Sequence, residues 1–222
     1  MLRPLTVKMG YSSVKPVKVG ICGLGTVGGG TLNVLKRNAE EITRRAGRGI
    51  EVAQIAIRSP KPQYDTTGIN LTNDVFDVVN NPEIDIVIEL IGGYTLAHEL
   101  VLKAIDNGKH VVTANKALLA VHGNEIFARA RAKGVIVAFE AAVAGGIPVI
   151  KAIREGLAAN RINWLAGIIN GTGNFILSEM REKGRAFDDV LKEAQALGYA
   201  EADPTFDVEG IDAAHKLTIL AS

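Results

Sequence analysis

The sequence predicts an α/β protein with a Rossmann-type, doubly wound parallel sheet, followed by part of a second, α+β domain. Aliphatic runs of strand length alternate with amphipathic helical segments in the first part of the chain. A glycine-rich loop joins the first aliphatic run to the first helical segment, and the alternation stops after Gly145-Gly146. Strands that alternate with helices at this spacing favour right-handed crossovers and a parallel sheet.

The bulk composition is that of an ordinary globular protein. Of the 222 residues, 47% are hydrophobic and 22% are charged, and the formal net charge is +1. This balance gives no electrostatic basis for binding nucleic acid or an anionic membrane surface. No apolar run approaches the ~20 residues that a membrane span needs. The single cysteine, Cys22, fits a reducing compartment, so we expect a cytoplasmic protein.

The first part of the chain contains the elements of the predicted sheet. The run "VKVGIC" alternates and is rich in β-branched residues, which is typical of a strand, and four further runs also predict strands. The five predicted strands are 17–22, 51–57, 85–90, 110–114 and 134–140. Helical periodicity between them predicts helices over 31–47, 97–108 and 123–134, with glycine at or near each end.

The pattern of the chain changes after residue 146. We expect a helix over 147–159, a strand over 162–170, helices over 174–184 and 187–198, and a last helix from near Gly210. That last helix has no stop signal before the chain ends, so we expect a second domain that is cut short. We therefore predict that the chain has three segments: a flexible tail at 1–15 with no signal-peptide pattern, a Rossmann domain at 16–145, and the second domain at 146–222.

The loop "GLGTVG" carries the spacing of a dinucleotide-binding turn. Gly23, Gly25 and Gly28 form G-x-G-x-x-G directly after a predicted strand and directly before a predicted helix, and this context makes the motif far more specific. Gly23 provides the tight turn, Gly25 leaves room for the pyrophosphate, and Gly28 lets the helix approach the strand. The backbone amides of Thr26 and Val27 point at the phosphates.

The end of the second predicted strand indicates which dinucleotide is bound. A carboxylate there accepts a hydrogen bond from the ribose 2′-hydroxyl of NAD, but this strand ends in "AIRSPK". Arg58, with Lys61 behind it, would attract a 2′-phosphate instead, which favours NADP over NAD. The alternative is that Arg58 only stacks on the adenine.

Lys116 occupies an unusual position at the start of a predicted helix. The segment "TANKALLA" places Thr113 or Asn115 at the helix start and Lys116 in the first turn, where a cation opposes the helix dipole. Such a lysine is easier to explain if it faces an anion or a reacting oxygen at the carboxyl ends of the strands. A purely structural role explains its position equally well.

The segment "GYAEADPTFDVEGIDAAHK" concentrates carboxylates near the end of the chain. Asp212 and Lys216 are four residues apart and share a helical face, which in the ordinary case is a surface pair contributing ~0.3–0.5 kcal/mol. Glu201, Asp207 and Asp212 also converge on one short element, where they would repel one another unless a cation is supplied. A substrate ammonium group would supply it. The alternative is a solvated loop running into a helix, and we take His215 as a surface residue.

Taken together and in order, the motifs of this chain resemble those of homoserine dehydrogenase. They are "GICGLGTVGGG", "VIELIGG", "VVTANKALLA", "FEAAVAGGIPVI", "INGTGNFIL" and "LGYAEADPTFDVEGIDAAHKLTILA", and they run from about residue 16 to the last residue. The resemblance implies NAD(P)-dependent interconversion of L-homoserine and L-aspartate 4-semialdehyde, in threonine, methionine and isoleucine biosynthesis. It also implies a homodimer or homotetramer for the full-length protein, and makes 146–222 the first part of the catalytic domain.

The resemblance also implies roles for individual residues. Lys216 would exchange a proton with the substrate oxygen, Lys116 would lie beside nicotinamide and substrate as the rival for that role, and Glu201, Asp207 and Asp212 would hold the substrate amino group and order the pocket. The cofactor would contact Gly23, Gly25, Thr26, Val27, Gly28, Arg58, Gly92, Gly93 and Lys116. A sodium ion would bind the backbone carbonyls of Glu140, Val143, Gly145 and Ile147.

The chain departs from the family pattern at two points, and two other functions are alternatives. Gly173 replaces a residue that usually carries a hydroxyl, and family chains continue well beyond residue 222. A phosphorylating semialdehyde dehydrogenase is one rival, but it needs a thiolate, and Cys22 lies beneath the phosphate loop. A non-catalytic NADP-binding fragment or sensor module is the other, although a pure binder would have no need of Lys116 and Lys216.

Overall fold

The computed structural model describes residues 14–222, so most of the tail predicted at 1–15 lies outside the described residues. The chain divides into two compact units. Within the described residues, unit 1 comprises 14–113 and Asn124–Ala138, and unit 2 comprises Ala114–Gly123 and Phe139–Ser222. The domain boundary at residue 145 stays a prediction.

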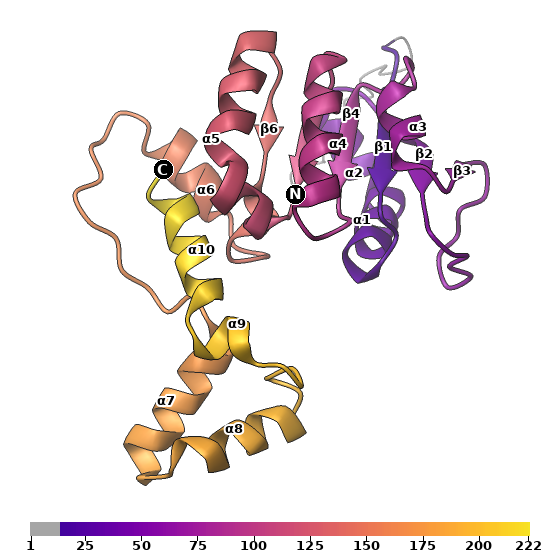
Figure 1. Ribbon diagram of the computed structural model, residues 1–222. Helices are drawn as coiled ribbons and strands as arrows, with labels where there is room; N and C mark the ends of the chain where they lie inside the picture. Colours follow the sequence, from indigo (N-terminus) through magenta and orange to yellow (C-terminus); the bar gives the residue numbers. More distant parts are fainter. Residues whose placement is uncertain (1–13) are drawn as a thin grey trace, which may run out of the picture. The chain divides into compact units, whose positions relative to one another are not determined.

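Unit 1 is built on a six-stranded sheet in the order β3-β2-β1-β4-β5-β6, with every neighbouring pair parallel (Figure 1). The strands are β1 (Val17–Cys22), β2 (Ile50–Ala56), β3 (Asn70–Thr72), β4 (Ile86–Glu89), β5 (His110–Thr113) and β6 (Val137–Ala138). The central strands are aliphatic because both faces of a parallel sheet are covered. Ile21, Ile55 and Val87 are accordingly fully buried.

The strand order determines which face of the sheet each helix of unit 1 covers. They are α1 (Thr26–Arg37), α2 (Ala39–Ala46), α3 (Val75–Asn80), α4 (Thr95–Asp106) and the later turns of α5 (Lys116–Lys133). The chain moves from β1 to β2 in one direction and from β3 through β4 to β6 in the other. Since right-handed crossovers put oppositely directed connections on opposite faces, α1 and α2 cover one face and α3 and α4 the other. The order reverses between β1 and β4, where such sheets bind ligands.

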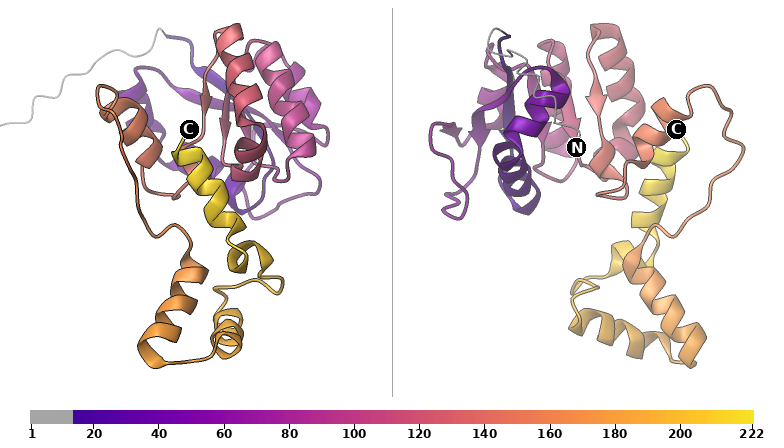
Figure 2. Two further views of the ribbon diagram at one scale, coloured as in Figure 1. Left: turned by 60° about the vertical axis from the view of Figure 1, so that its left-hand side comes forward. Right: turned by 180° about the vertical axis from the view of Figure 1, so that it is seen from behind.

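Unit 2 is largely helical and begins with the first turns of α5. It contains a 3-10 turn η1 (Glu140–Ala142), α6 (Val149–Lys151), a π-helical turn η2 (Ala152–Gly156), α7 (Gly171–Lys183), α8 (Phe187–Ala196), α9 (Thr205–Val208) and α10 (Ile211–Leu220). Figure 2 shows α7 and α8 joined by a short turn, in which Gly184 is left-handed. Ile176, Val190, Ala194 and Ala200 form the buried cluster between these helices.

The fold class is confirmed, and the differences from the predicted elements have physical reasons. The predicted helix over 31–47 is two helices that meet at Asn38. Only residues 137–138 of the strand predicted at 134–140 pair with β5. The short elements β3, α3 and α9 were not predicted, because three to six residues carry too little periodicity to recognise.

The strand predicted over 162–170 is wrong for this structure, which gives these residues no regular element. Trp164 and Ile168 are about four-fifths exposed, at 80% and 79%. A strand needs a neighbour for its backbone hydrogen bonds, and the described residues place none beside this segment.

Across the described part of the chain, every helix is too short or too polar to cross a membrane.

Candidate active site

The glycine loop lies at the carboxyl end of β1, and its geometry requires glycine at two positions. Gly23 has φ +100°, and a Cβ there would lie 2.6 Å from the Leu90 carbonyl oxygen. A Cβ on Gly28 would lie 2.0 Å from the Gly23 carbonyl oxygen, so α1 approaches β1 only without one. Gly25, in contrast, has open space around it. The loop therefore leaves room above Gly25 for a ligand.

The N-terminus of α1 is a ready site for an anion. Gly25 is the N-cap residue, and no side chain caps the helix. Thr26 and Val27 follow it and are exposed, and the first turn of α1 contains no acidic residue. Unpaired amides and the positive end of the helix dipole together favour a phosphate at this place.

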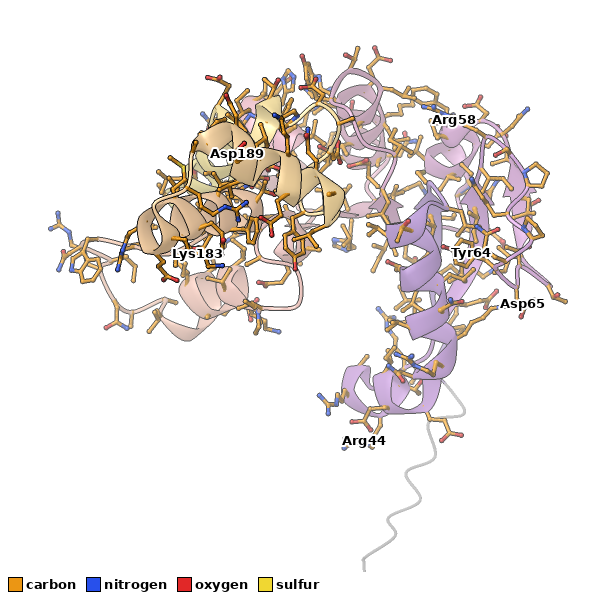
Figure 3. The ribbon with its side chains drawn as sticks, turned by 90° about the horizontal axis from the view of Figure 1, so that it is seen from below. Arg44, Arg58, Tyr64, Asp65, Lys183 and Asp189 are labelled. Atoms are coloured by element: carbon orange, nitrogen blue, oxygen red, sulfur yellow. The ribbon has the colours of Figure 1, made fainter. Side chains whose placement is uncertain are left out.

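Arg58 lines an open hollow of 460 Å³ at the carboxyl ends of β2 and β3. Its other lining residues are Ile57, Ser59, Pro60, Leu71, Thr72 and Asn73. The chain after Arg58 is held against α1, because the Tyr64 ring occupies the space that a Cβ on Gly29 would need and Asp65 forms a 2.7 Å ion pair with Lys36. Figure 3 shows Arg58, Tyr64 and Asp65 on one side of unit 1.

The segment after β4 is held by Glu89, a residue that sequence reasoning missed. Its side chain is fully buried and accepts hydrogen bonds from the Ile91 amide at 2.9 Å and the Thr113 hydroxyl at 2.6 Å. Gly92 and Gly93 follow with φ +74° and +67°, conformations that favour glycine. The structure thus places the "IGG" turn at the same edge of the sheet as the glycine loop.

Cys22 does not have the properties of a nucleophile. The thiol is fully buried at the end of β1. Burial raises the pKa of the Cys22 thiol to about 12, and the charge of Glu89 adds to this effect. A thiol of this kind stays protonated near neutral pH and has no access to a substrate, which argues against thioester chemistry.

Within unit 2, Lys116 lies at the start of α5 and pairs with Asp212. Asn115 caps this helix, since its Oδ1 accepts a 3.1 Å hydrogen bond from the Leu118 amide. The Lys116 ammonium lies 2.5 Å from Oδ1 of Asp212, near the start of α10. The cation that opposes the dipole of α5 is therefore compensated by a carboxylate rather than left in solvent.

Asp212 is the most heavily hydrogen-bonded carboxylate in this cluster. It is only 5% exposed. Its Oδ2 accepts from the Lys216 ammonium at 2.7 Å and from the Asn170 amide at 2.9 Å, in addition to the Lys116 pair on Oδ1. Burial by itself would raise the pKa of Asp212, but the hydrogen bonds from Lys116, Lys216 and Asn170 outweigh it and lower the pKa to about 2. Asp212 is thus a fixed anion.

The structure brings four of the predicted catalytic and substrate-binding residues together through Asn170. The Asn170 amide nitrogen also donates to Asp207 at 2.7 Å, and the Lys216 ammonium also donates to the Ile169 carbonyl at 2.7 Å. Asp207, Asp212, Lys116 and Lys216 therefore form one network. Glu201 is exposed and makes no side-chain hydrogen bond within the described residues, so the network does not include it.

His215 is half-buried rather than a surface residue, and its ring forms a T-shaped pair with the Phe206 ring, with 6.2 Å between the centroids. A Cβ on Gly173 would lie 3.0 Å from Oδ1 of Asn170, so a larger residue there would press on the network. Asn170 itself was not predicted as a site residue.

The turn after η1 was expected to hold a sodium ion. Ala144 and Gly146 have positive φ, +47° and +85°, and the Glu140 carboxylate accepts from the amides of Ile150 and Lys151 at 2.9 Å. Within the described residues, the carbonyl oxygens of Val143 and Gly145 accept no hydrogen bond. These two carbonyl oxygens fit a hard cation, since such ions take carbonyl ligands. The other two expected ligands, the carbonyls of Glu140 and Ile147, accept hydrogen bonds from the amides of Val143 at 3.4 Å and Val149 at 2.8 Å.

Two family models match this chain and together cover most of it. Residues 23–140 match the model described as "Homoserine dehydrogenase, NAD binding domain", and residues 148–222 match the model described as "Homoserine dehydrogenase". The chain belongs to the homoserine dehydrogenase family. The members of this family are oxidoreductases, and the match to the NAD-binding domain includes the glycine loop and strands β2 to β6.

Homoserine dehydrogenases from several organisms are similar to this chain. The one from Pseudomonas aeruginosa is 87% identical over 209 residues, which is 94% of this chain and 48% of that protein. A crystal structure of a homoserine dehydrogenase from Thiobacillus denitrificans is 74% identical with a TM-score of 0.87, covering 93% of this chain and 48% of that one. A hyperthermophilic archaeal homoserine dehydrogenase in complex with NADPH is 29% identical with a TM-score of 0.80, covering 93% and 69% respectively.

The chain spans about half the length of the curated homoserine dehydrogenases it matches, 48% for the one from Pseudomonas aeruginosa.

Proposed function

We propose that the protein to which this chain contributes interconverts L-homoserine and L-aspartate 4-semialdehyde with a nicotinamide cofactor. The observation that carries the proposal is the network of Lys116, Asp212 and Lys216 in a member of this family. A module that only binds a dinucleotide has no need of two lysines held on one buried carboxylate. This argues against the alternative of a non-catalytic NADP-binding or sensor module.

The glycine loop is the proposed site of the cofactor pyrophosphate. Gly23 and Gly28 shape the loop, the open space at Gly25 admits the phosphates, and the uncapped amides of Thr26 and Val27 bind them. Gly92 and Gly93 would lie along the cofactor after β4. Arg58 would bind a 2′-phosphate in its hollow, so we propose NADP as the preferred cofactor and NAD as the alternative.

The lysines differ in how they are held, and this suggests a role for each. An ammonium has three N–H donors. Lys216 gives one to Asp212 and one to the Ile169 carbonyl, which leaves a single donor in a fixed direction. The nicotinamide cofactor supplies or accepts the hydride when it is bound. We assign Lys216 to the proton exchange with the substrate oxygen and the more exposed Lys116 to binding the substrate, with Lys116 as the rival proton donor.

The three predicted carboxylates, Glu201, Asp207 and Asp212, differ in how many hydrogen bonds they already accept. Asp212 is already neutralised by two lysines, so its main proposed role is to hold them in place. Asp207 accepts from Asn170 alone among the described residues, and the Glu201 carboxylate accepts no hydrogen bond there. Both keep free oxygens for an ammonium group. We therefore propose Asp207 and Glu201 as its ligands, with Asp212 completing the pocket.

A sodium ion is proposed at the turn of Glu140, Val143, Gly145 and Ile147. Support comes from the unpartnered carbonyls of Val143 and Gly145 and from the left-handed residues that turn the chain there. The ion would stabilise this turn through backbone oxygens. The proposal is tested by thermal unfolding of the chain in NaCl and in choline chloride at equal ionic strength, and equal unfolding temperatures would count against it.

The remaining parts of the proposal concern the whole protein. We propose a homodimer or homotetramer in the cytoplasm, acting in threonine, methionine and isoleucine biosynthesis. We also propose that residues 16–145 form the dinucleotide-binding domain and that 146–222 form the first part of the catalytic domain.

The activity is tested with a chimera in which this chain is continued by the remaining sequence of the Pseudomonas aeruginosa relative. NADPH oxidation is followed on addition of L-aspartate 4-semialdehyde, and NADPH binding is measured on both the chimera and the 222-residue chain. We expect binding by both and turnover by the chimera. Binding by the chimera without turnover would favour the sensor module.

A further inference from the structure

The network of unit 2 contains one uncharged side chain at its centre, Asn170. Its amide nitrogen donates to Asp207 Oδ1 at 2.7 Å and to Asp212 Oδ2 at 2.9 Å. Its amide oxygen accepts from the Gly173 amide at 2.6 Å and so caps α7. One side chain therefore joins the start of α7 to α9 and to α10.

Asparagine is well suited to this position among the common side chains. It offers two N–H donors and an acceptor on one short, planar group. Aspartate would present a third carboxylate to Asp207 and Asp212, and serine would offer one hydroxyl donor for two carboxylates. Two anions that face one group repel each other unless donors lie between them, and Asn170 is such a donor.

The residue before Asn170, Ile169, also makes a hydrogen bond to the network. The Ile169 carbonyl accepts from the Lys216 ammonium at 2.7 Å, and Lys216 also donates to the oxygen of Asp212 that Asn170 contacts. The placement of Asn170 is thus coupled to the direction of the Lys216 ammonium through both the backbone and Asp212.

We infer that Asn170 is a positioning residue that sets the geometry of Asp207, Asp212 and Lys216 for the reaction. This inference rests on the proposed function and deepens it. Asn170 acts through these side chains, and its role is separate from its capping of α7. Serine and aspartate are also good N-cap residues, so both variants keep the cap. Asn170→Ser reduces the number of donors, and Asn170→Asp removes the donors and adds a negative charge.

The experiment compares both variants with the wild-type chimera in unfolding temperature, NADPH binding and steady-state kinetics from pH 5.5 to 8. Asn160→Ser, a substitution in an exposed loop, is the matched control. We expect Asn170→Ser to lower the unfolding temperature by at most about 2–4 °C and to keep the NADPH affinity, while kcat/KM for L-aspartate 4-semialdehyde falls roughly 10- to 100-fold. The control is expected to match the wild type.

The aspartate variant provides a readout that a purely structural role would not change. A carboxylate at position 170 would face Asp207 and Asp212, with Lys116 and Lys216 as the nearby cations, so it would bind a proton more readily than usual. Protonation restores a donor. The activity of Asn170→Asp relative to wild type should therefore rise as the pH falls from 8 to 5.5.

Wild-type kcat/KM and an unchanged pH profile in both variants would overturn the inference. Loss of activity in proportion to loss of unfolding temperature would overturn it too, because Asn170 would then only cap α7. If the wild-type chimera has no activity, the proposed function fails instead. The pKa of Asp212, measured by carboxyl NMR on the 222-residue chain, then decides: it should rise in Asn170→Ser, and an unchanged value would contradict a role for Asn170.

Discussion

The Lys116 ammonium lies 2.5 Å from Oδ1 of Asp212, and this ion pair joins the start of α5 to the start of α10. The Asp212 side chain is buried, with only 7% of its surface exposed to solvent. Removing Asp212 would leave the Lys116 and Lys216 ammonium groups without the carboxylate that they share. The geometry of the network is therefore sensitive to the loss of this carboxylate.

Asp212 gives the chain a measurable dependence of stability on pH. Its pKa is lowered from 3.8 to about 2, so the folded state favours the ionised form. The stabilisation is complete above pH ~4 and is lost as the pH falls through about 2, with about 1 kcal/mol lost by pH 3. The difference in free energy of unfolding between wild type and Asp212→Asn should shrink accordingly between pH 5 and 3, as urea unfolding will measure. A constant difference would contradict the low pKa.

Substitutions in the glycine loop should separate folding from cofactor binding. Gly28→Ala places a Cβ 2.0 Å from the Gly23 carbonyl oxygen, so we expect both the unfolding temperature and NADPH binding to fall. Gly25→Ala meets no atom within 4 Å, so the chain should fold normally while NADPH affinity falls roughly tenfold or more.

Gly30→Ala is the control for this pair of loop variants. It also meets no atom within 4 Å, and it lies within α1, where alanine is favoured over glycine by about 1 kcal/mol. We expect unchanged NADPH affinity and a higher unfolding temperature. Normal NADPH binding by Gly25→Ala would exclude the loop as the phosphate site.

Arg58 should decide between the two dinucleotides. A charge-assisted hydrogen bond contributes about 1.5–3 kcal/mol, so Arg58→Ala should weaken NADPH binding about 10- to 100-fold and leave NADH binding unchanged. Isothermal titration of the 222-residue chain with each cofactor measures both affinities. Arg48→Ala, an exposed arginine just before β2, is the control. An equal loss for NADPH and NADH would instead indicate stacking of Arg58 on the adenine.

Cys22 should be inert towards alkylating reagents in the folded chain. Its pKa is about 12 and its side chain is fully buried, so the thiolate is both rare and inaccessible. Iodoacetamide at pH 8 should label the chain only after unfolding in guanidinium, as mass spectrometry will show. Rapid labelling of the folded chain would contradict this prediction and would make Cys22 a candidate nucleophile.

Most of the sheet could be predicted from the sequence, because the central strands of a parallel sheet are buried on both faces and stand out as aliphatic runs. The glycine loop could be predicted equally well, because its steric requirements depend on only a few neighbouring residues. The strand predicted at 162–170 is not formed because one segment by itself does not show whether a neighbouring strand is present, and only a neighbour makes a strand stable.

The candidate site was only partly predictable. Asp212 and Lys216 share a helical turn, so their pairing follows from local spacing. Asn170 is 37 residues from Asp207 and 42 from Asp212, and only the fold brings them together. Glu89 was hidden for a different reason, since a carboxylate at the end of an aliphatic strand gives no sign of whether it is buried.

The most direct test of the proposed function is the turnover number of the chimera with Lys216→Ala. Lys192→Ala, an exposed lysine on α8, is the matched control. Loss of proton transfer should lower kcat for L-aspartate 4-semialdehyde reduction about 10²- to 10⁴-fold, with NADPH affinity unchanged and the control fully active. Full activity in Lys216→Ala would contradict the assignment of Lys216 as the proton donor.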